Sequence, residues 1–370
     1  MHSSTRRQWL MGASLQAAEL GALLWPGAAQ ALPARPLAFP RDHGSHPELR
    51  TEWWYITGHV QAQGQPWGFQ LTFFRSRVDA TQGLQSAFAA KQLLFAHAAI
   101  TDVKGQRLRH DQRIARAGFG VAQASEADTR IRLQDWTLER SDVPGSTPGE
   151  APRSRYTTRI TGGELGLELQ FDSTQPVLLQ GQQGLSRKGP DAAQASYYYS
   201  EPQLATRGTI TRAGGQPEAV TGTTWLDHEW SSQVLDADAS GWNWIGANLD
   251  DGGALMAFQI RSKTGAKLWA HATWRDASGK MTQFAPGEVD FTPTQLWRSP
   301  RTQAEYPVAT EIRTGATRWQ VKPLQADQEL DSRRSTGAVY WEGAVTVERD
   351  GRPAGRAYLE MTGYVQPMKL

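Results

Sequence analysis

The densest group of ionisable side chains in the sequence is Asp227-His228-Glu229, with tryptophans close by at positions 225 and 230. If this segment is a strand, Asp227 and Glu229 point to one face of a sheet and His228 points to the other. Two carboxyl groups that share a face beside tryptophan rings can differ in pKa, so that one keeps its proton near neutral pH. The pattern therefore predicts acid–base chemistry, with Asp227, His228 and Glu229 as the catalytic candidates.

The chemistry we expect is hydration or isomerisation. Asp227 would protonate a carbon–carbon double bond or activate a carbonyl group, and water with His228 or Glu229 as base would complete the reaction. Facing aromatic rings would stabilise a cationic intermediate; the candidates are Trp230, Trp242 and Tyr199. The structural alternative is that Asp227 and Glu229 bond an arginine and nearby backbone at a barrel rim.

Other polar and aromatic residues are candidates for contact with a ligand. Glu52, which precedes Trp53-Trp54-Tyr55, is either a ligand-facing acid or the ion-pair partner of Arg50 or Arg75. The histidine at position 97 is either a ligand contact or a core residue with satisfied hydrogen bonds. The predicted ligand-binding residues are Glu52, Trp54, His97, Tyr198, Tyr199, Trp230, Trp242, Trp244 and Gln259.

Two other classes of chemistry find little support. The chain has no cysteine, which removes disulfides, thiolate nucleophiles and thiolate metal sites. It contains no Gly-x-Ser-x-Gly elbow, and a Ser231–His228–Asp227 triad cannot converge because neighbours on one strand face opposite sides. His43 and His46 lack the spacing of a metal motif, although together with Asp42 they could form an exposed site. We therefore predict neither a metal nor a cofactor.

The elements that position these residues include one unit that occurs twice. Each copy is a tryptophan-bearing segment, a glycine-containing turn and a Phe-Gln segment that returns beside the first, which is typical of an antiparallel hairpin. The copies are Trp54, Gly58, Gly64 and Phe69-Gln70-Leu71, and then Trp242, Gly246, Gly252 and Phe258-Gln259-Ile260. The repetition indicates two similar β domains.

The rest of the chain reads as short strands separated by Gly, Asp, Asn and Ser. Alternation such as Phe69, Leu71 and Phe73 against Gln70 and Thr72 is typical of a sheet with one buried face. Many strands with few helices predict sandwiches or barrels, and a barrel of about eight strands can hold one small ligand. The fold class we predict is all-β, with two consecutive antiparallel domains, either sandwiches or barrels, at residues 32–195 and 196–370.

The N-terminal residues 1–31 resemble a targeting signal rather than part of the folded domain. Arg6-Arg7 followed by a weakly apolar stretch and Ala29-Gln30-Ala31 is similar to a twin-arginine export signal with a cleavage site. An amphipathic N-terminal anchor is the alternative. No other stretch is apolar enough to cross a bilayer. The sequence thus predicts a periplasmic protein without a transmembrane segment in the mature chain.

The overall charge limits the class of partner. The net charge of +2 over 370 residues makes no electrostatic case for binding nucleic acid or an anionic membrane surface. The aromatic content instead suits an apolar small molecule, because ligand sites are mostly apolar with a few well-placed polar groups.

Several motifs together resemble the AttH-like group of secreted proteins labelled as hydrolases, which is related to carotenoid 1,2-hydratase. The motifs are His46-Pro47-Glu48-Leu49-Arg50-Thr51-Glu52-Trp53-Trp54-Tyr55, Gly68 to Arg75, Ala96 to Asp102, Tyr198-Tyr199-Ser200, Thr224 to Ser232 and Gly241-Trp242-Asn243-Trp244. They occur in the family's order over most of residues 43–365. The resemblance implies two lipocalin-like barrels, in which an arginine such as Arg75 or Arg261 would stack on the tryptophan at the closed end.

The resemblance also implies two functions. The first is hydratase-like acid–base chemistry on an isoprenoid, polyene or acyl-chain ligand. The alternative is a non-catalytic carrier of a lipid or small molecule that accompanies an ABC transporter permease. The hydrolase label finds no nucleophile motif in these residues.

Overall fold

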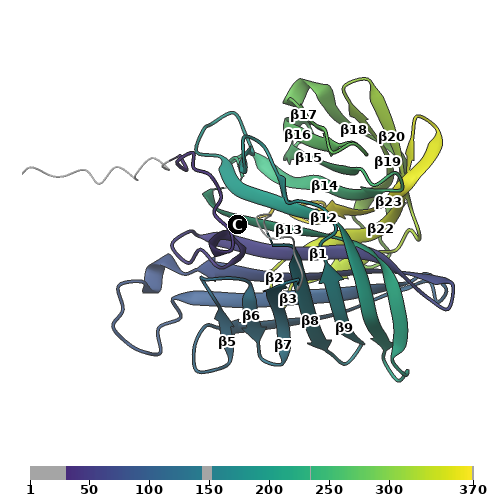
Figure 1. Cartoon of the computed structure of the whole chain (residues 1–370). Helices are drawn as coiled ribbons and strands as arrows, with labels where there is room; N and C mark the ends of the chain where they lie inside the picture. Colours follow the sequence, from purple (N-terminus) through teal and green to yellow (C-terminus); the bar gives the residue numbers. More distant parts are fainter. Residues whose placement is uncertain (1–30, 144–151, 234, 369–370) are drawn as a thin grey trace, which may run out of the picture. The chain divides into compact units, whose positions relative to one another are not determined.

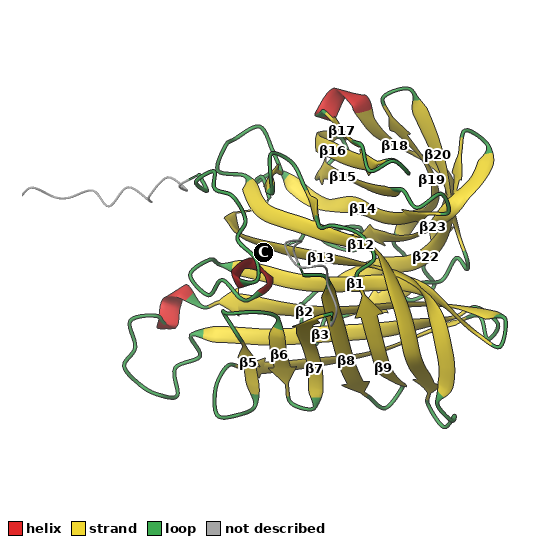
Figure 2. Cartoon of the chain, viewed as in Figure 1, coloured by secondary structure: helices red, strands yellow, loops and turns green. Residues whose placement is uncertain are grey.

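The computed structural model describes residues 31–143, 152–233 and 235–368, and its regular elements are antiparallel β-strands with three short 3₁₀ turns (Figures 1 and 2). This confirms the predicted all-β class. The predicted export signal at residues 1–31 lies, apart from its last residue, outside the described residues. The 3₁₀ turns are η1 (Arg41–His43), η2 (Asp79–Thr81) and η3 (Pro286–Glu288).

The first sheet contains 13 strands of the described residues. Their order is β4-β3-β2-β1-β13-β12-β9-β8-β7-β6-β5, and β10 and β11 pair with β12 beside this path. The strands are β1 (Thr51–Ala62), β2 (Gln65–Arg77), β3 (Gln92–Asp102), β4 (Arg107–Arg116), β5 (Ala122–Ala124), β6 (Arg130–Leu133), β7 (Trp136–Asp142), β8 (Ser154–Thr161), β9 (Leu165–Asp172), β10 (Leu178–Leu179), β11 (Leu185–Arg187), β12 (Ala195–Arg212) and β13 (Glu218–Gln233).

The second sheet contains ten strands of the described residues. Their order is β17-β16-β15-β14-β23-β22-β20-β19-β18, and β21 pairs with β22 beside it. The strands are β14 (Ala239–Leu249), β15 (Ala254–Ser262), β16 (Lys267–Arg275), β17 (Met281–Phe284), β18 (Val289–Arg298), β19 (Glu305–Thr314), β20 (Thr317–Pro323), β21 (Glu329–Asp331), β22 (Val339–Arg349) and β23 (Arg352–Met361).

The unit that occurs twice in the sequence forms a hairpin inside each sheet, the third and fourth strands of the strand order. In β1–β2, Trp54 pairs with Phe73, and in β14–β15, Trp242 pairs with Ile260. Gly64 and Gly252 occupy the two turns with φ angles of 77° and 86°, a backbone conformation that glycine adopts without steric cost. The predicted hairpins are therefore confirmed.

The division of the chain between the sheets falls after β13. The sequence analysis placed the domain boundary at 195/196, but β12 and β13 both belong to the first sheet, where they pair with β9 and β1. The second sheet begins at Ala239. Strand composition is similar on both sides of residue 195, so the sequence pattern holds no signal for which sheet a strand joins.

Each sheet curls around a hydrophobic core of its own. In the first sheet, Trp54 and Ala96 from one end of the strand order share a core with Ile131 and Leu133 from the other end. In the second sheet, Ile245, Trp319 and Val345 belong to one such core. Residues from distant strands can share a core only when the sheet wraps onto itself, which is the lipocalin-like barrel form.

A third core joins the two sheets. It contains Tyr55 and Trp225 of the first sheet together with Trp244 and Met256 of the second. Strand β1 is consequently buried on both faces, as its almost continuous burial shows. On its outer face, His59 Nε2 lies 2.8 Å from the carbonyl oxygen of Ala357 in β23. Residues 31–370 form one compact unit, within which this interface positions the site.

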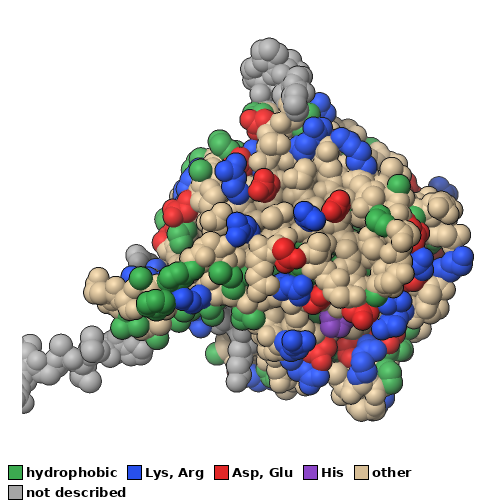
Figure 3. Space-filling model, turned by 90° about the horizontal axis from the view of Figure 1, so that it is seen from below, with side chains coloured by type: hydrophobic (Ala, Val, Ile, Leu, Met, Phe, Trp, Pro, Cys, Tyr) green, Lys and Arg blue, Asp and Glu red, His purple; other side chains and the backbone are tan. Residues whose placement is uncertain are grey.

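The charged side chains mix on the surface. On the face shown in Figure 3, basic and acidic groups are interspersed rather than segregated. This face therefore has no extended patch of a single charge sign that would attract a highly charged polymer such as nucleic acid. Among the described residues the structure contains no helix with the length and apolar character that a membrane span requires.

The contact between the sheets yields a test at Gly68 of β2. An alanine methyl group at this position would lie 2.5 Å from the Cβ of Ala344 in β22. We expect Gly68→Ala to lower the free energy of unfolding by about 1–3 kcal/mol, because overpacking forces neighbouring atoms apart. Urea denaturation followed by tryptophan fluorescence measures it. The control is Gly83→Ala, where a Cβ meets nothing within 4 Å; equal losses in the two variants would contradict the packing argument.

Candidate functional site

A cavity of about 180 Å³ lies between the two sheets. Residues of β1, β2, β3 and β13 form one side, and residues of β14, β15, β22 and β23 form the other. Eight aromatic side chains line the cavity, among them Trp53, Tyr55, Phe74, Trp242, Trp244 and Tyr340. Four carboxyl groups also line it: Asp227, Glu229, Glu342 and Glu360. An aromatic cavity with a few polar groups is the usual form of a small-molecule site.

Asp227 is the most completely bonded of these carboxyl groups. It is 3% exposed. Its Oδ1 accepts hydrogen bonds from Ser200 Oγ and Trp225 Nε1, both at 2.6 Å, and its Oδ2 accepts one from Tyr198 Oη at 2.6 Å. Trp244 Nε1 of the second sheet donates in turn to Tyr198 Oη at 3.0 Å. Both sheets thus contribute to the position of this carboxyl group.

The environment of Asp227 favours its protonated form. Burial raises the pKa of Asp227 to about 7, although the hydrogen bonds from Ser200, Tyr198 and Trp225 oppose the shift. A carboxyl group with this pKa exchanges its proton near neutral pH. That is the property required of a general acid or base.

Glu229 lies two residues further along β13 and on the same face, as the alternation predicted. Its Oε1 contacts Lys188 Nζ at 2.9 Å and accepts a hydrogen bond from Ser196 Oγ at 2.6 Å. The Lys188 ammonium group also lies over the rings of Tyr198 and Phe258, at 4.6 Å and 4.4 Å from their centroids. Glu229 is therefore committed to a buried ion pair in the cavity wall.

The sequence analysis missed Glu342 and Glu360. They face each other on β22 and β23. Glu342 follows Tyr340-Trp341 and Glu360 stands between Leu359 and Met361. A single acid within an apolar or aromatic run is the signal that drew attention to Glu52, and the same criterion would have found these two residues.

The other face of β13 belongs to the core of the first barrel. His228 lies there, 0% exposed, with its ring stacked on that of Trp54 at 4.5 Å between centroids. Burial lowers the pKa of His228 to about 4. Because it points away from the cavity, His228 cannot act on the same ligand as Asp227, which corrects the proposed role of His228 as the second base.

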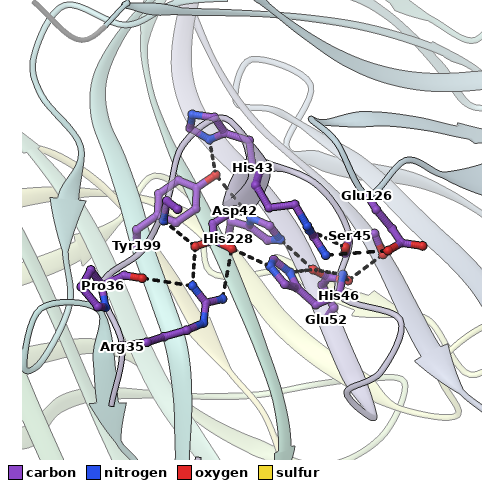
Figure 4. A network of polar contacts seen from close by, with 12 residues as sticks. Arg35, Pro36, Asp42, His43, Ser45, His46, Glu52, Glu126, Tyr199 and His228 are labelled. Carbon is purple, nitrogen blue, oxygen red and sulfur yellow. Dashed lines mark hydrogen bonds and ion pairs between the residues drawn. The ribbon is translucent and has the colours of Figure 1, made fainter. Parts of the chain in front are cut away.

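His228 belongs to a buried polar network that surrounds Glu52 (Figure 4). Glu52 Oε1 contacts His228 Nε2 at 3.0 Å and His46 Nδ1 at 2.7 Å. Its Oε2 accepts hydrogen bonds from Arg75 Nε at 2.8 Å and Ser45 Oγ at 2.9 Å. Of the two arginines that the sequence offered as partners of Glu52, the structure thus selects Arg75.

The network extends to the segment that precedes β1. His46 Nε2 lies 3.0 Å from Asp42 Oδ1, and Asp42 pairs with Arg35 at 2.6 Å. Burial opposes a charge on His46, but the hydrogen bonds to Asp42 and Glu52 outweigh it and raise its pKa. For Glu52, hydrogen bonds from His228 and His46 likewise overcome burial and hold its pKa below the usual range. Positive and negative groups therefore alternate along the network and fasten this segment to the barrel.

The three side chains His46, Glu52 and His228 also have the composition of a metal site, since one ligand atom of each lies within 4.8 Å of the others. The facing nitrogens of both histidines, however, lie at hydrogen-bond distance from the same oxygen, Glu52 Oε1. The other oxygen of Glu52 is paired with Arg75. A cation would have to break these contacts beside a guanidinium group. We therefore interpret the cluster as a structural clamp.

The predicted ligand-binding residues fall into three groups. Trp242 and Trp244 line the cavity with Asp227 and Glu229. Two others lie directly behind its wall: Tyr198 bonds Asp227, and His97 lies 3.5 Å from Glu342. The remaining residues are not brought to the cavity; Glu52, Trp54, Tyr199 and Trp230 surround His228, and the Gln259 side chain accepts a bond from the Phe291 backbone at 3.4 Å.

The expected stacking of arginine on the repeated tryptophans is wrong. Arg261 lies over the ring of Tyr364, 3.9 Å from its centroid, and Asn243 accepts a bond from its Nε. Arg75 pairs with Glu52 instead of a ring. Each guanidinium group thus binds a partner other than a tryptophan ring. The spacing of residues along the sequence does not reveal which partner that is.

Comparison with known proteins shows that the chain is similar to the AttH-like family over most of its length. The model of the AttH-like family matches residues 30–364. The crystal structure of a candidate AttH from Nitrosomonas europaea is 53% identical, with a TM-score of 0.82 over 91% of this chain and 100% of that chain. A search of curated proteins finds no match.

More distant structures share the fold. Kievitone hydratase from Nectria haematococca has a TM-score of 0.65 at 12% identity, over 89% of this chain and 93% of its own. CghA in complex with Sch210972 has a TM-score of 0.51 at 12% identity, over 85% of this chain and 88% of its own. At this level of identity the likeness concerns the fold alone.

The clamp yields a test at Glu52. We expect Glu52→Gln to lower the free energy of unfolding by about 3–5 kcal/mol, because it leaves the buried Arg75 guanidinium group without its carboxylate. Urea denaturation at pH 7 measures the loss. Glu164→Gln is the control, since Glu164 is 47% exposed where it pairs with Arg109, and such a pair contributes about 0–1 kcal/mol. A loss for Glu52→Gln no larger than that of the control would show that the network does not clamp the fold.

Proposed function

This chain belongs to the AttH-like family, and we propose that it binds an apolar small molecule between its two sheets and transfers a proton to it from Asp227. The observation that carries the proposal is the state of this carboxyl group. It lies in the wall of an aromatic cavity and burial raises its pKa to about 7. The reaction class is the hydration or isomerisation of a double bond.

The surroundings of Asp227 suit that reaction. Protonation of a double bond leaves a carbocation, and the negative faces of the Trp242 and Trp244 rings in the same wall would stabilise it. Burial of Asp227, which is 3% exposed, strengthens electrostatic interactions at this point of the cavity. Kievitone hydratase, which shares the fold, is a hydratase by name, but the reaction class proposed for this chain rests on its own Asp227.

The second candidate function is carriage without chemistry. The observation that favours it is the complete bonding of Asp227, since Ser200, Trp225 and Tyr198 occupy both of its oxygens. A carboxyl group that is held in this way could serve only to fix the cavity wall. Such a carrier would deliver its ligand to a transport system such as an ABC permease. Native mass spectrometry of the purified protein distinguishes the two, because a carrier retains an unaltered ligand.

Asp227→Asn tests the catalytic proposal. Wild type is incubated in H₂¹⁸O with an isoprenoid alcohol, a polyene and an unsaturated acyl chain, and mass spectrometry follows the labelled or isomerised product. We expect kcat of Asp227→Asn to fall about 100-fold or more, since the amide cannot donate the proton. The wild-type rate should decrease as the pH rises through about 7, because Asp227 loses its proton there.

The control for this experiment is Glu218→Gln, a change at the partly exposed start of the same strand, where Glu218 pairs with Arg212. It should retain wild-type turnover. If Asp227→Asn also turned over the substrate at the wild-type rate, Asp227 would not be the acid.

We also propose that the protein acts in the periplasm, on the basis of Arg6-Arg7 and the apolar stretch that follows. Replacing both arginines by lysine should block the twin-arginine route, which depends on this pair. Cell fractionation with an antibody against the mature chain measures the shift to the cytoplasm. An unchanged periplasmic fraction would contradict the proposed route.

A further inference from the structure

Glu342 and Glu360 form a pair of acids in the wall that the second sheet contributes to the cavity. They are direct partners in the antiparallel register of β22 and β23. Glu342 is 2% exposed, and Glu360 keeps part of its surface where it lines the cavity. Trp242 Nε1 donates to Glu360 Oε1 at 3.2 Å, and Tyr55 Oη lies 3.5 Å from Glu342 Oε2. The pair is thus built into the wall rather than exposed at its rim.

Two like charges placed directly opposite each other on neighbouring strands repel. Among the described residues, neither Glu342 nor Glu360 has an ion pair with a lysine or an arginine; the basic side chain beside Glu342 is that of His97, whose Nε2 lies 3.5 Å from Glu342 Oε1. Burial, and then the facing Glu342, raise the pKa of Glu360 well above its ordinary value. At neutral pH the favoured state is therefore one in which Glu360 keeps its proton beside Glu342.

The position of His97 supports a site at this pair. The side chain is 1% exposed, and neither ring nitrogen has a hydrogen-bond partner within the described part of the chain. Its Nε2 lies 3.5 Å from Glu342 Oε1, and its ring contacts those of Phe74 and Tyr340, which line the cavity. Buried polar groups are nearly always bonded, so an unbonded imidazole behind a carboxyl pair requires an explanation. A role of the His97 ring in positioning the Glu342 carboxyl group would explain these unbonded nitrogens.

We propose that Glu342 and Glu360 are a second proton-exchanging group of this cavity, that they act on the same ligand as Asp227, and that His97 positions Glu342. The inference rests on the proposed function, since it supplies the partner that the chemistry of Asp227 lacks. Glu229, which the sequence offered for this role, is held by Lys188 and Ser196. His228 lies on the other face of its strand.

The reaction balances with these groups and water alone. The proton of Asp227 and the π electrons of the double bond form a new C–H bond, which leaves the adjacent carbon positive. A lone pair of water forms the C–O bond at that carbon, and the surplus proton of the water passes to the carboxylate of the Glu342–Glu360 pair. Asp227 is left ionised and the pair doubly protonated, and proton exchange through solvent restores both. In an isomerisation the pair removes a proton from the neighbouring carbon instead.

The proton held at the Glu342–Glu360 pair is tested without any substrate, by infrared spectroscopy of the full chain during a pH titration. The readout is the C=O stretching band of protonated carboxyl groups. Wild type should show one component that disappears near pH 7, and Asp227→Asn should lack it. A second component should persist above that pH. It should be absent from Glu360→Gln and should titrate at lower pH in Glu342→Gln, because each change removes the facing acid. If Glu360→Gln kept the second component, the pair would be refuted.

The matched control is Glu348→Gln, on the same strand as Glu342 but paired with Lys322 and 29% exposed. Its spectrum should equal that of wild type. His97→Gln should shift the titration of the second component without abolishing it, as expected of a positioning residue. An unchanged titration would overturn that role of His97. Binding of the neutral dye Nile red, measured by fluorescence, shows that the cavity is intact in each variant.

The catalytic role is tested on the compound that wild type converts. Glu342→Gln and Glu360→Gln should each lower kcat at least about tenfold while Nile red still binds. Wild-type turnover in both variants would overturn the second group and leave Asp227 in place. The proposed function would be overturned if Asp227→Asn kept wild-type turnover, or if wild type converted none of the compounds. The infrared titration would in either case still decide whether the Glu342–Glu360 pair holds a proton above pH 7.

Discussion

Strands β1 and β13 are covered on both faces, and the alternation of their side chains governs what each residue can do. Along β13, Leu226, His228 and Trp230 enter the core of the first barrel, whereas Asp227 and Glu229 reach the cavity. Because alternate residues cannot exchange faces, one short segment contributes both to the stability of a barrel and to the chemistry of a site. A shift of one residue in register would exchange these roles, so the site depends on the exact pairing of β13 with β1.

Buried carboxyl groups on the two faces include both compensated and uncompensated ones. On the inner face, Glu52 is surrounded by Arg75, His46 and His228, which keep it ionised. On the cavity side, neither Asp227 nor Glu360 has a lysine or arginine partner among the described residues, and burial raises the pKa of both. A compensated carboxylate stabilises the fold but does not exchange its proton near neutral pH. An uncompensated one costs stability, and such a cost is commonly found at functional sites.

The sequence predicted the parts of this arrangement that depend on neighbours along the chain. Alternation was enough to place Asp227 and Glu229 on one face and His228 on the other, and the repeated hairpins were found from glycine and tryptophan spacing. It could not assign β12 and β13 to the first sheet, because both candidate sheets consist of similar strands. The sequence also could not predict that Glu342 and Asp227 line the same cavity, because their proximity arises from the packing of the two sheets and not from their spacing along the chain. The sequence also could not show that the His97 ring lies beside Glu342, because that contact joins residues from different sheets.

The cavity and the pKa of Asp227 are properties of the pair of barrels rather than of either one. Trp244 of the second sheet bonds the tyrosine that holds Asp227, and Met256 and Tyr358 lie in the core that covers this face of the first sheet. A first barrel without its neighbour would expose Asp227 to water, and hydration of the carboxylate would return its pKa toward the ordinary value. The packing of the two sheets, which the absence of a side chain at Gly68 permits beside Ala344, is therefore a condition for the raised pKa of Asp227. This dependence gives a physical reason for the two barrels to occur in one chain.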